Sequence, residues 1–145
     1  MQKIDPHTTL AAVMTTDLVL VSPKDTVKEV DDIFRKHNIH HIPVVSGMGE
    51  LQGIISKADL LKISHGWGIF RKKEQQTYND ALFEMLLAED IMTKNVACLE
   101  PMDTVEVAVG IFKENLFHAI PVVSGGIVVG LVTTFDLLNY AFREV

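Results

Sequence analysis

The stretch that decides the fold is His40-His41-Ile42-Pro43-Val44-Val45-Ser46-Gly47, because the chain repeats it as His118-Ala119-Ile120-Pro121-Val122-Val123-Ser124-Gly125. The two copies are 78 positions apart, and the same displacement carries Met14-Thr15 onto Met92-Thr93 and Asp25-Thr26-Val27 onto Asp103-Thr104-Val105. After the repeated Ser-Gly the displacement is 77, which pairs Gly53 with Gly130 and Asp59-Leu60-Leu61 with Asp136-Leu137-Leu138. The chain is therefore an internal duplication that has lost one residue in a turn.

The composition is that of a folded domain of ordinary size. The chain has 145 residues, of which 48% are hydrophobic, so it carries no signature of disorder. Each half alone would be marginal in size, and we expect the two halves to pack together. The net charge of −6 argues against nucleic acid as the main partner.

Several sequence features predict a cytoplasmic protein. The N-terminus lacks the apolar core of a signal peptide, and no apolar run is long enough to cross a membrane. The single cysteine, Cys98, cannot form an internal disulfide, which favours a reducing compartment. Because Cys98 lies in an apolar run, we expect it to be buried.

The first half predicts the element order β-α-β-β-α. After a loose lead-in (residues 1–7) and a short helix capped by Thr8-Thr9, the expected elements are a strand over 18–21, a helix from Thr26, strands over 42–45 and 51–55, and a helix over 57–64. Thr26 and Glu29 form a capping-box pattern, and Val27, Val30, Ile33 and Phe34 share one helical face.

The second half predicts the same order, with strands over 96–99, 120–123 and 127–132 and helices over 104–115 and 134–142. We expect Gly110 to permit close helix packing. Residues 65–89 form a linker with a mobile loop part and a helix over 80–89, in which Ala81, Leu82, Met85, Leu86 and Ala88 are apolar. Trp67 with Arg71-Lys72-Lys73 could contact a partner, cover a phosphate or belong to a solvated linker.

These motifs, in this order and duplicated, resemble a tandem pair of cystathionine-β-synthase (CBS) domains, known as a Bateman module. The resemblance covers residues 8–143, as CBS domain 1 (8–64), the linker (65–89) and CBS domain 2 (90–143). It implies an α/β fold in which the repeats pack sheet to sheet about a pseudo-twofold axis. It also implies two clefts that bind AMP, ADP, ATP or S-adenosylmethionine, with or without Mg²⁺, in a stand-alone module that forms a homodimer and signals to a protein partner.

The sharpest candidate residues are Ser56 with Asp59 and Thr133 with Asp136. A carboxylate can accept hydrogen bonds from both vicinal hydroxyls of a ribose, and a helix N-terminus favours a phosphate. The resemblance assigns these roles to the Asp and the hydroxyl residue respectively. The alternative for a single instance is an ordinary helix cap with an acidic third residue, worth about 1 kcal/mol.

The resemblance implies that the nucleobase slot beside one Asp uses the Met-Thr and first-strand region of the other half. The Asp136 cleft would then contain Met14, Leu18 and Val19 with His118, Ala119 and Ile120, and the Asp59 cleft Met92, Val96 and Ala97 with His40, His41 and Ile42. The alternative is that the apolar members are plain core. Because His41 and Lys57 have the uncharged counterparts Ala119 and Thr134, an anionic ligand should prefer the Asp59 cleft.

Other function classes are weaker. His37, His40 and His41 have helical spacing, but the helix should end near Asn38, so we expect no metal site. No catalytic constellation is evident, which predicts a regulatory protein and not an enzyme. A structural dimerisation module with empty clefts remains the alternative to a ligand sensor.

Overall fold

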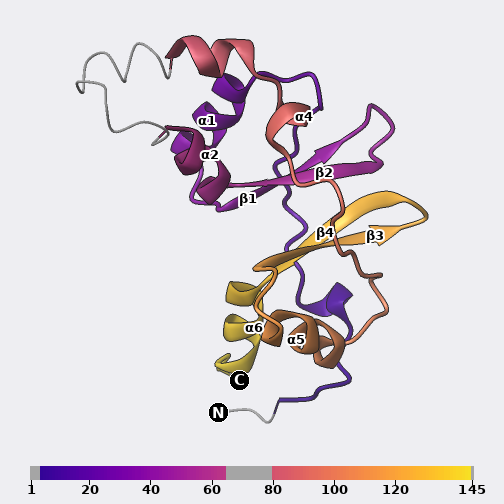
Figure 1. Cartoon of the computed structure of the whole chain (residues 1–145). Helices are drawn as coiled ribbons and strands as arrows, with labels where there is room; N and C mark the ends of the chain where they lie inside the picture. The colour runs from indigo at the N-terminus through magenta and orange to yellow at the C-terminus, as the bar shows by residue number, and fades with distance from the viewer. Residues whose placement is uncertain (1–3, 65–79, 145) are drawn as a thin grey trace. The chain divides into compact units, whose positions relative to one another are not determined.

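The computed structural model describes residues 4–64 and 80–144 (Figure 1). The predicted roles of Trp67 and Arg71-Lys72-Lys73, and the expected mobility of the linker loop, lie outside these residues. The chain divides into two compact units. Unit 1 comprises Met1–Leu18, Gly49–Leu51 and Val96–Val145, and unit 2 comprises Val19–Met48 and Gln52–Asn95.

Both units combine a two-stranded sheet with helices. The first repeat contains the 3-10 helix η1 (Leu10–Ala12), α1 (Val27–Lys36), β1 (His41–Val45), β2 (Leu51–Ser56) and α2 (Lys57–Ser64), and helical residues 80–85 follow it. The second repeat contains α4 (Ala88–Ile91), α5 (Val105–Lys113), β3 (Ala119–Ser124), β4 (Ile127–Thr133) and α6 (Thr134–Ala141). The sheets are β1-β2 and β3-β4, so the mixed α/β fold class is confirmed.

The strands predicted over 18–21 and 96–99 are wrong. Each segment makes a single parallel bridge, Val21 with Val44 and Leu99 with Val122. Val21 accepts a hydrogen bond from the Val45 N–H at 2.9 Å, and Leu99 accepts one from the Val123 N–H at 2.8 Å. A proline follows two residues after each bridge, at positions 23 and 101, and the pairing does not extend into a ladder.

The remaining elements follow the local sequence signals. Thr26 and Glu29 form the predicted capping box, since the Glu29 N–H donates to Thr26 Oγ1 at 3.2 Å and the Thr26 N–H to Glu29 Oε2 at 3.1 Å. Val27, Val30 and Phe34 of α1 are buried, as predicted. In the β3-β4 turn, Gly125 and Gly126 have φ of +58° and +85°, values that suit glycine and close a tight hairpin.

The N-terminal segment belongs structurally to the second repeat. Leu10 is fully buried in the core formed with Val105, Ile120 and neighbouring residues, and its N–H donates to the Asp103 carbonyl at 2.8 Å. Further along, Thr15 pairs with Leu131 of β4 through two backbone hydrogen bonds of 2.9 and 3.0 Å. In Figure 1 the indigo η1 lies beside α5.

The same contacts recur in unit 2, shifted along the chain. The Ala88 and Glu89 N–H groups donate to the Asp25 and Pro23 carbonyls at 2.7 and 3.0 Å. Thr93 pairs with Ile54 of β2 through backbone hydrogen bonds of 2.9 and 3.0 Å. Each repeat therefore supplies its Met-Thr segment to the sheet of the other repeat, so each unit contains parts of both repeats.

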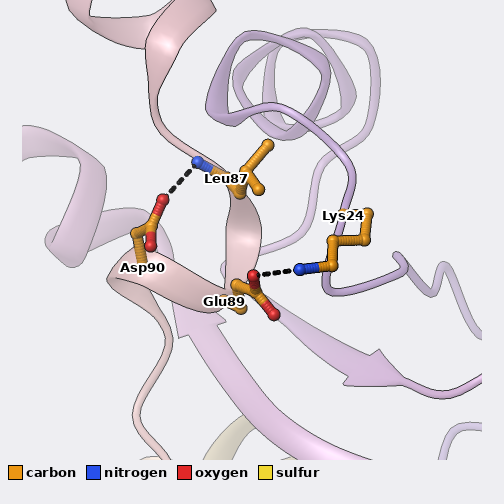
Figure 2. Close-up of polar contacts among 4 residues, drawn as sticks. All are labelled: Lys24, Leu87, Glu89 and Asp90. Carbon is orange, nitrogen blue, oxygen red and sulfur yellow. Dashed lines mark hydrogen bonds and ion pairs between the residues drawn. The ribbon is translucent and has the colours of Figure 1, made fainter.

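Side chains reinforce the attachment of this second segment in unit 2. Figure 2 shows Lys24 Nζ on Glu89 Oε1, an ion pair of 2.6 Å. It also shows the Leu87 N–H donating to Asp90 Oδ2 at 2.8 Å, which satisfies a backbone donor at the start of α4. The Glu89 side chain raises the pKa of Lys24, by its hydrogen bond and then by its charge.

The N-terminal lead-in is anchored and not loose over residues 5–7. The Pro6 and Thr8 carbonyls accept the Glu106 and Val105 N–H groups at 3.0 and 2.8 Å, which satisfies the first donors of α5. Tyr140 Oη also holds this segment, because it accepts the Asp5 N–H at 3.1 Å and lies 2.5 Å from Thr8 Oγ1. The predicted capping of the first short helix is wrong, since Thr9 makes no side-chain capping bond there.

Three further expectations are corrected. The helix predicted over 80–89 is interrupted, because the Leu86 carbonyl accepts the Val27 N–H at 2.8 Å and Leu87 bridges to Thr26. Within that segment Phe83 is buried while Ala81 and Met85 are exposed. Cys98 is exposed. A Cβ added to Gly110 would meet no atom within 4 Å, so Gly110 does not serve close packing.

None of the described helices has the length and hydropathy needed to cross a bilayer.

Candidate functional site

Asp136 lies at the start of α6 and its carboxylate accepts three hydrogen bonds. Oδ2 accepts the Thr133 N–H at 2.8 Å and the Thr133 hydroxyl at 3.0 Å. Oδ1 accepts the Thr15 hydroxyl at 2.9 Å. The Asp136 N–H donates to Thr133 Oγ1 at 3.1 Å, which completes a capping box. Asp136 is therefore both a helix cap and a contact between β4-α6 and the N-terminal segment.

Asp59 occupies the equivalent place at the start of α2 but has fewer donors. Its Oδ2 accepts the Ser56 N–H at 2.9 Å, and its own N–H donates to Ser56 Oγ at 3.1 Å. Among residues 4–64 and 80–144 no group donates to Oδ1 of Asp59. This half-buried carboxylate thus keeps most of its acceptor capacity.

The N-termini of α2 and α6 offer fewer free donors than the sequence suggested. The Lys57 N–H donates to the His40 carbonyl at 2.8 Å, and the Thr134 N–H to the His118 carbonyl at 3.3 Å. The N–H groups of Asp59 and Asp136 are bound by the caps. In the first turn of each helix this leaves one N–H, that of Ala58 in α2 and of Phe135 in α6, without a partner in the described part of its unit. These bonds also fix the residue before β1 or β3 against the start of the helix.

Gly53 and Gly130 make room for the Met-Thr segments. The two glycines occupy equivalent positions in the repeats, and the sequence predicted no role for either. A Cβ on Gly53 of β2 would lie 2.6 Å from Met92 Sδ and 2.7 Å from the Thr93 carbonyl oxygen. A Cβ on Gly130 of β4 would lie 2.9 Å from Met14 Cγ. The signal in the sequence was a glycine inside an apolar strand, which indicates close approach by another segment.

The structure gathers most of the predicted site residues into two sets, one in each unit. Unit 1 holds Met14, Leu18, His118, Ala119, Ile120, Thr133 and Asp136, while unit 2 holds His40, His41, Ile42, Ser56, Lys57, Asp59 and Met92. Val19 belongs to unit 2, whereas Val96 and Ala97 belong to unit 1. The predicted placement of these three against the opposite Asp therefore stays a prediction.

Burial separates the side chains that a ligand could reach from those that form core. Ile42 and Ile120 are fully buried, and Ala119 is 4% exposed, so the side chains of these three residues form core. Met14 and Met92 are half-buried, and His40, His118 and Lys57 are exposed. Lys57 is the first residue of α2, two positions before Asp59, where Thr134 stands in the other unit.

The described residues contain no cluster of three or more His, Cys, Asp or Glu side chains that could hold a metal ion. His37 is the C-cap of α1, with φ of −119° and ψ of 143°, and His41 begins β1. The three histidines at positions 37, 40 and 41 consequently do not share a helical face.

Comparison with known proteins identifies the architecture. The CBS domain profile matches residues 4–66 and 88–143. Inosine-5′-monophosphate dehydrogenase from Korarchaeum cryptofilum is 32% identical over 129 residues, which span 88% of this chain and 22% of that protein. The chain spans 49% of another relative, the Methanocaldococcus jannaschii protein MJ1225, at 28% identity, so it covers less than two thirds of these curated relatives.

Two solved structures show the same fold along nearly the whole chain. The CBS domain of a CBS-domain-containing membrane protein from Sphaerobacter thermophilus has a TM-score of 0.78 and 29% identity, covering 96% of this chain and 91% of that one. The CBS domain pair of protein MJ0100, in complex with 5′-methylthioadenosine and S-adenosyl-L-methionine, has a TM-score of 0.71 and 27% identity, covering 92% and 95%. The duplicated motif, the two similar units and these matches show that the chain belongs to the CBS domain family, as a CBS domain pair.

Proposed function

We propose that this CBS pair is a regulatory module that binds an adenosine-containing ligand and passes the bound state to a partner. The observation that carries the proposal is the pair of carboxylates, Asp59 and Asp136, held at equivalent helix starts with one oxygen committed to the cap. The MJ0100 pair, 27% identical over nearly the whole chain, is solved with two adenosyl compounds. That likeness supports AMP, ADP, ATP or S-adenosylmethionine as the ligand class.

The proposed recognition follows from the chemistry of each group. A carboxylate oxygen that is not used by the cap accepts the vicinal hydroxyls of the ribose. The backbone beside His40 or His118, fixed by its bond to the helix start, reads the edge of the nucleobase. Lys57 adds positive charge beside Asp59, whereas the uncharged Thr134 stands at the equivalent position beside Asp136. An anionic ligand therefore binds more tightly at the Asp59 site than at the Asp136 site, and a cationic ligand does not.

The proposed signal is a population shift. The Asp136 site contains the N-terminal segment of the first repeat together with β4 and α6 of the second. A ligand bound there stabilises the arrangement of these segments that it contacts best, and only by its difference in affinity between arrangements. We propose that a protein partner reads this difference, that the module acts without catalysis as a cytoplasmic homodimer, and that it needs no resident cofactor. Sedimentation of the pure protein tests the dimer.

A thermal-shift panel of AMP, ADP, ATP, S-adenosylmethionine, NAD and GTP, with and without Mg²⁺, tests the ligand class. A ligand at about 100 times its Kd adds roughly 2.7 kcal/mol of stability. The matched variants are Asp59→Asn and Asp136→Asn, because an asparagine oxygen can still accept the capping N–H while its NH₂ group cannot accept a ribose hydroxyl. We expect a shift for at least one adenosyl compound that one or both variants abolish.

A second candidate function is a structural module with no nucleotide. It is favoured by the observation that Asp59 and Asp136 each complete a capping box, which is a purely structural role. If the protein unfolds cooperatively and none of the compounds in the thermal-shift panel raises its Tm, the structural function is supported and the proposed ligand-binding function is refuted.

A further inference from the structure

The two aspartates differ in how much acceptor capacity remains for a ligand. A carboxylate offers about four lone-pair sites. Asp136 accepts from the Thr133 N–H, the Thr133 hydroxyl and the Thr15 hydroxyl, whereas Asp59 accepts from the Ser56 N–H. The two hydroxyls of a ribose therefore find room on Asp59 as it stands. On Asp136 one existing donor has to leave.

Of the three donors, Thr15 is the one that occupies Oδ1, and it can leave without disturbing the helix start. The Thr133 N–H is part of the capping box, and the Thr133 side chain is held by the Asp136 N–H. Thr15 is exposed, and its backbone is fixed by the two hydrogen bonds to Leu131 and by Met14 packing over Gly130. Its side chain can therefore rotate about χ1 while the segment stays in place.

The corresponding residue in the other unit does not make this contact. Thr93 has the same backbone pairing to β2, with hydrogen bonds of 2.9 and 3.0 Å. In the described part of the chain, however, its hydroxyl does not donate to Asp59. The difference between the two sites thus lies in one side-chain hydrogen bond and not in the backbone.

We propose that Thr15 is a gate on the Asp136 site, and this inference rests on the proposed adenosyl-binding function. With its hydroxyl on Oδ1 the site is closed to a ribose, so the Asp59 site fills first. Rotation of Thr15 opens the second site. The Thr15 side chain comes from the first repeat and Asp136 from the second, so opening the gate also breaks a contact between segments of the two repeats.

The experiment isolates each site and removes each hydroxyl. In the Asp59→Asn background, calorimetric titration with 5′-methylthioadenosine and with AMP compares Thr15, Thr15→Val and Thr15→Ser. We expect Thr15→Val to bind several-fold to about tenfold more tightly, tenfold being 1.4 kcal/mol, and Thr15→Ser to bind as Thr15 does because it keeps the hydroxyl. The matched control is Thr93→Val in the Asp136→Asn background, for which we expect no change.

Each outcome decides between the two proposals. Unchanged or weaker binding by Thr15→Val, with binding by the wild type intact, would overturn the gate and leave the sensor standing. An equal gain in Thr93→Val would also overturn it, since the effect would not depend on the Thr15 contact. If the wild type and every variant bind neither compound, and no other adenosyl compound of the thermal-shift panel stabilises the wild type, the proposed function fails and the gate fails with it.

Discussion

Gly53 gives the sharpest test of how the Met-Thr segments are held. A Cβ at this position would lie 2.7 Å from the Thr93 carbonyl oxygen, where ordinary contact begins at 3.4 Å, so Thr93 would have to withdraw by 0.7 Å (3.4 minus 2.7). That atom is backbone, and it accepts the Ile54 N–H at 3.0 Å while the Thr93 N–H donates back at 2.9 Å. Gly53→Ala therefore disrupts two paired hydrogen bonds as well as the contact with Met92.

The expected loss follows from these two terms. Two backbone hydrogen bonds contribute about 0.5–1.5 kcal/mol each, and overpacking costs about 1–3 kcal/mol. We expect Gly53→Ala to lower the free energy of unfolding by about 2–6 kcal/mol, measured by urea denaturation. Gly130→Ala should cost less, about 1–3 kcal/mol, because the nearest atoms belong to the flexible side chain of Met14.

Gly110→Ala is the matched control. Gly110 is an exposed residue inside α5, and a Cβ there would meet nothing within 4 Å. Alanine should raise the free energy of unfolding by about 0.5–1 kcal/mol. If the free energy of unfolding of Gly53→Ala lies within about 0.5 kcal/mol of the wild-type value, the Met92-Thr93 segment does not lie against β2 in solution. That result would refute the pairing of this segment with β2 in unit 2.

Three further predictions test other contacts. Thr26→Ala should lower the free energy of unfolding by about 1 kcal/mol, because it removes a capping box. Thr104→Ala should lower it clearly less, because Thr104 is the equivalent residue of the second repeat and makes no side-chain cap. Equal losses for the two variants in urea denaturation would contradict this prediction. Leu10→Ala should cost about 2–5 kcal/mol, because Leu10 is fully buried in the core of unit 1, and an undiminished unfolding midpoint would show that the N-terminal segment does not pack there. The hydrogen bond with Thr8, then that from the Asp5 N–H and the charge of Arg143, lower the pKa of Tyr140 below 10.0 against the opposing effect of burial. Since the folded pKa is the lower one, this contribution to stability is present above the unfolded pKa and is lost as pH falls through the folded pKa. In an absorbance titration of the phenolate, the wild type should show a component with a lowered pKa that Tyr140→Phe lacks; identical titration curves for the two proteins in this range would contradict the prediction.

Much of the fold follows from local sequence. The hairpins, the helix over 57–64 and the buried face of α1 come from apolar periodicity, glycine-bearing turns and caps that lie within a few residues of one another. The strands predicted over 18–21 and 96–99 failed because apolar runs alone do not specify how many residues pair with a neighbour. Cys98 and Met85 lie in apolar runs yet are exposed, since burial depends on distant segments that a local pattern does not contain.

For the candidate site, the sequence by itself determined the residue types and their positions: a hydroxyl three residues before an Asp at each helix start, and a Met-Thr pair ahead of each repeat. The tertiary structure decided that each Met-Thr segment lies over the glycine of the other repeat's sheet. It also decided that Thr15 donates to Asp136 while, among the described residues, Thr93 makes no such contact with Asp59. The Met-Thr pairs are identical in sequence, so a difference between them can arise only from the surroundings that packing brings to each side chain.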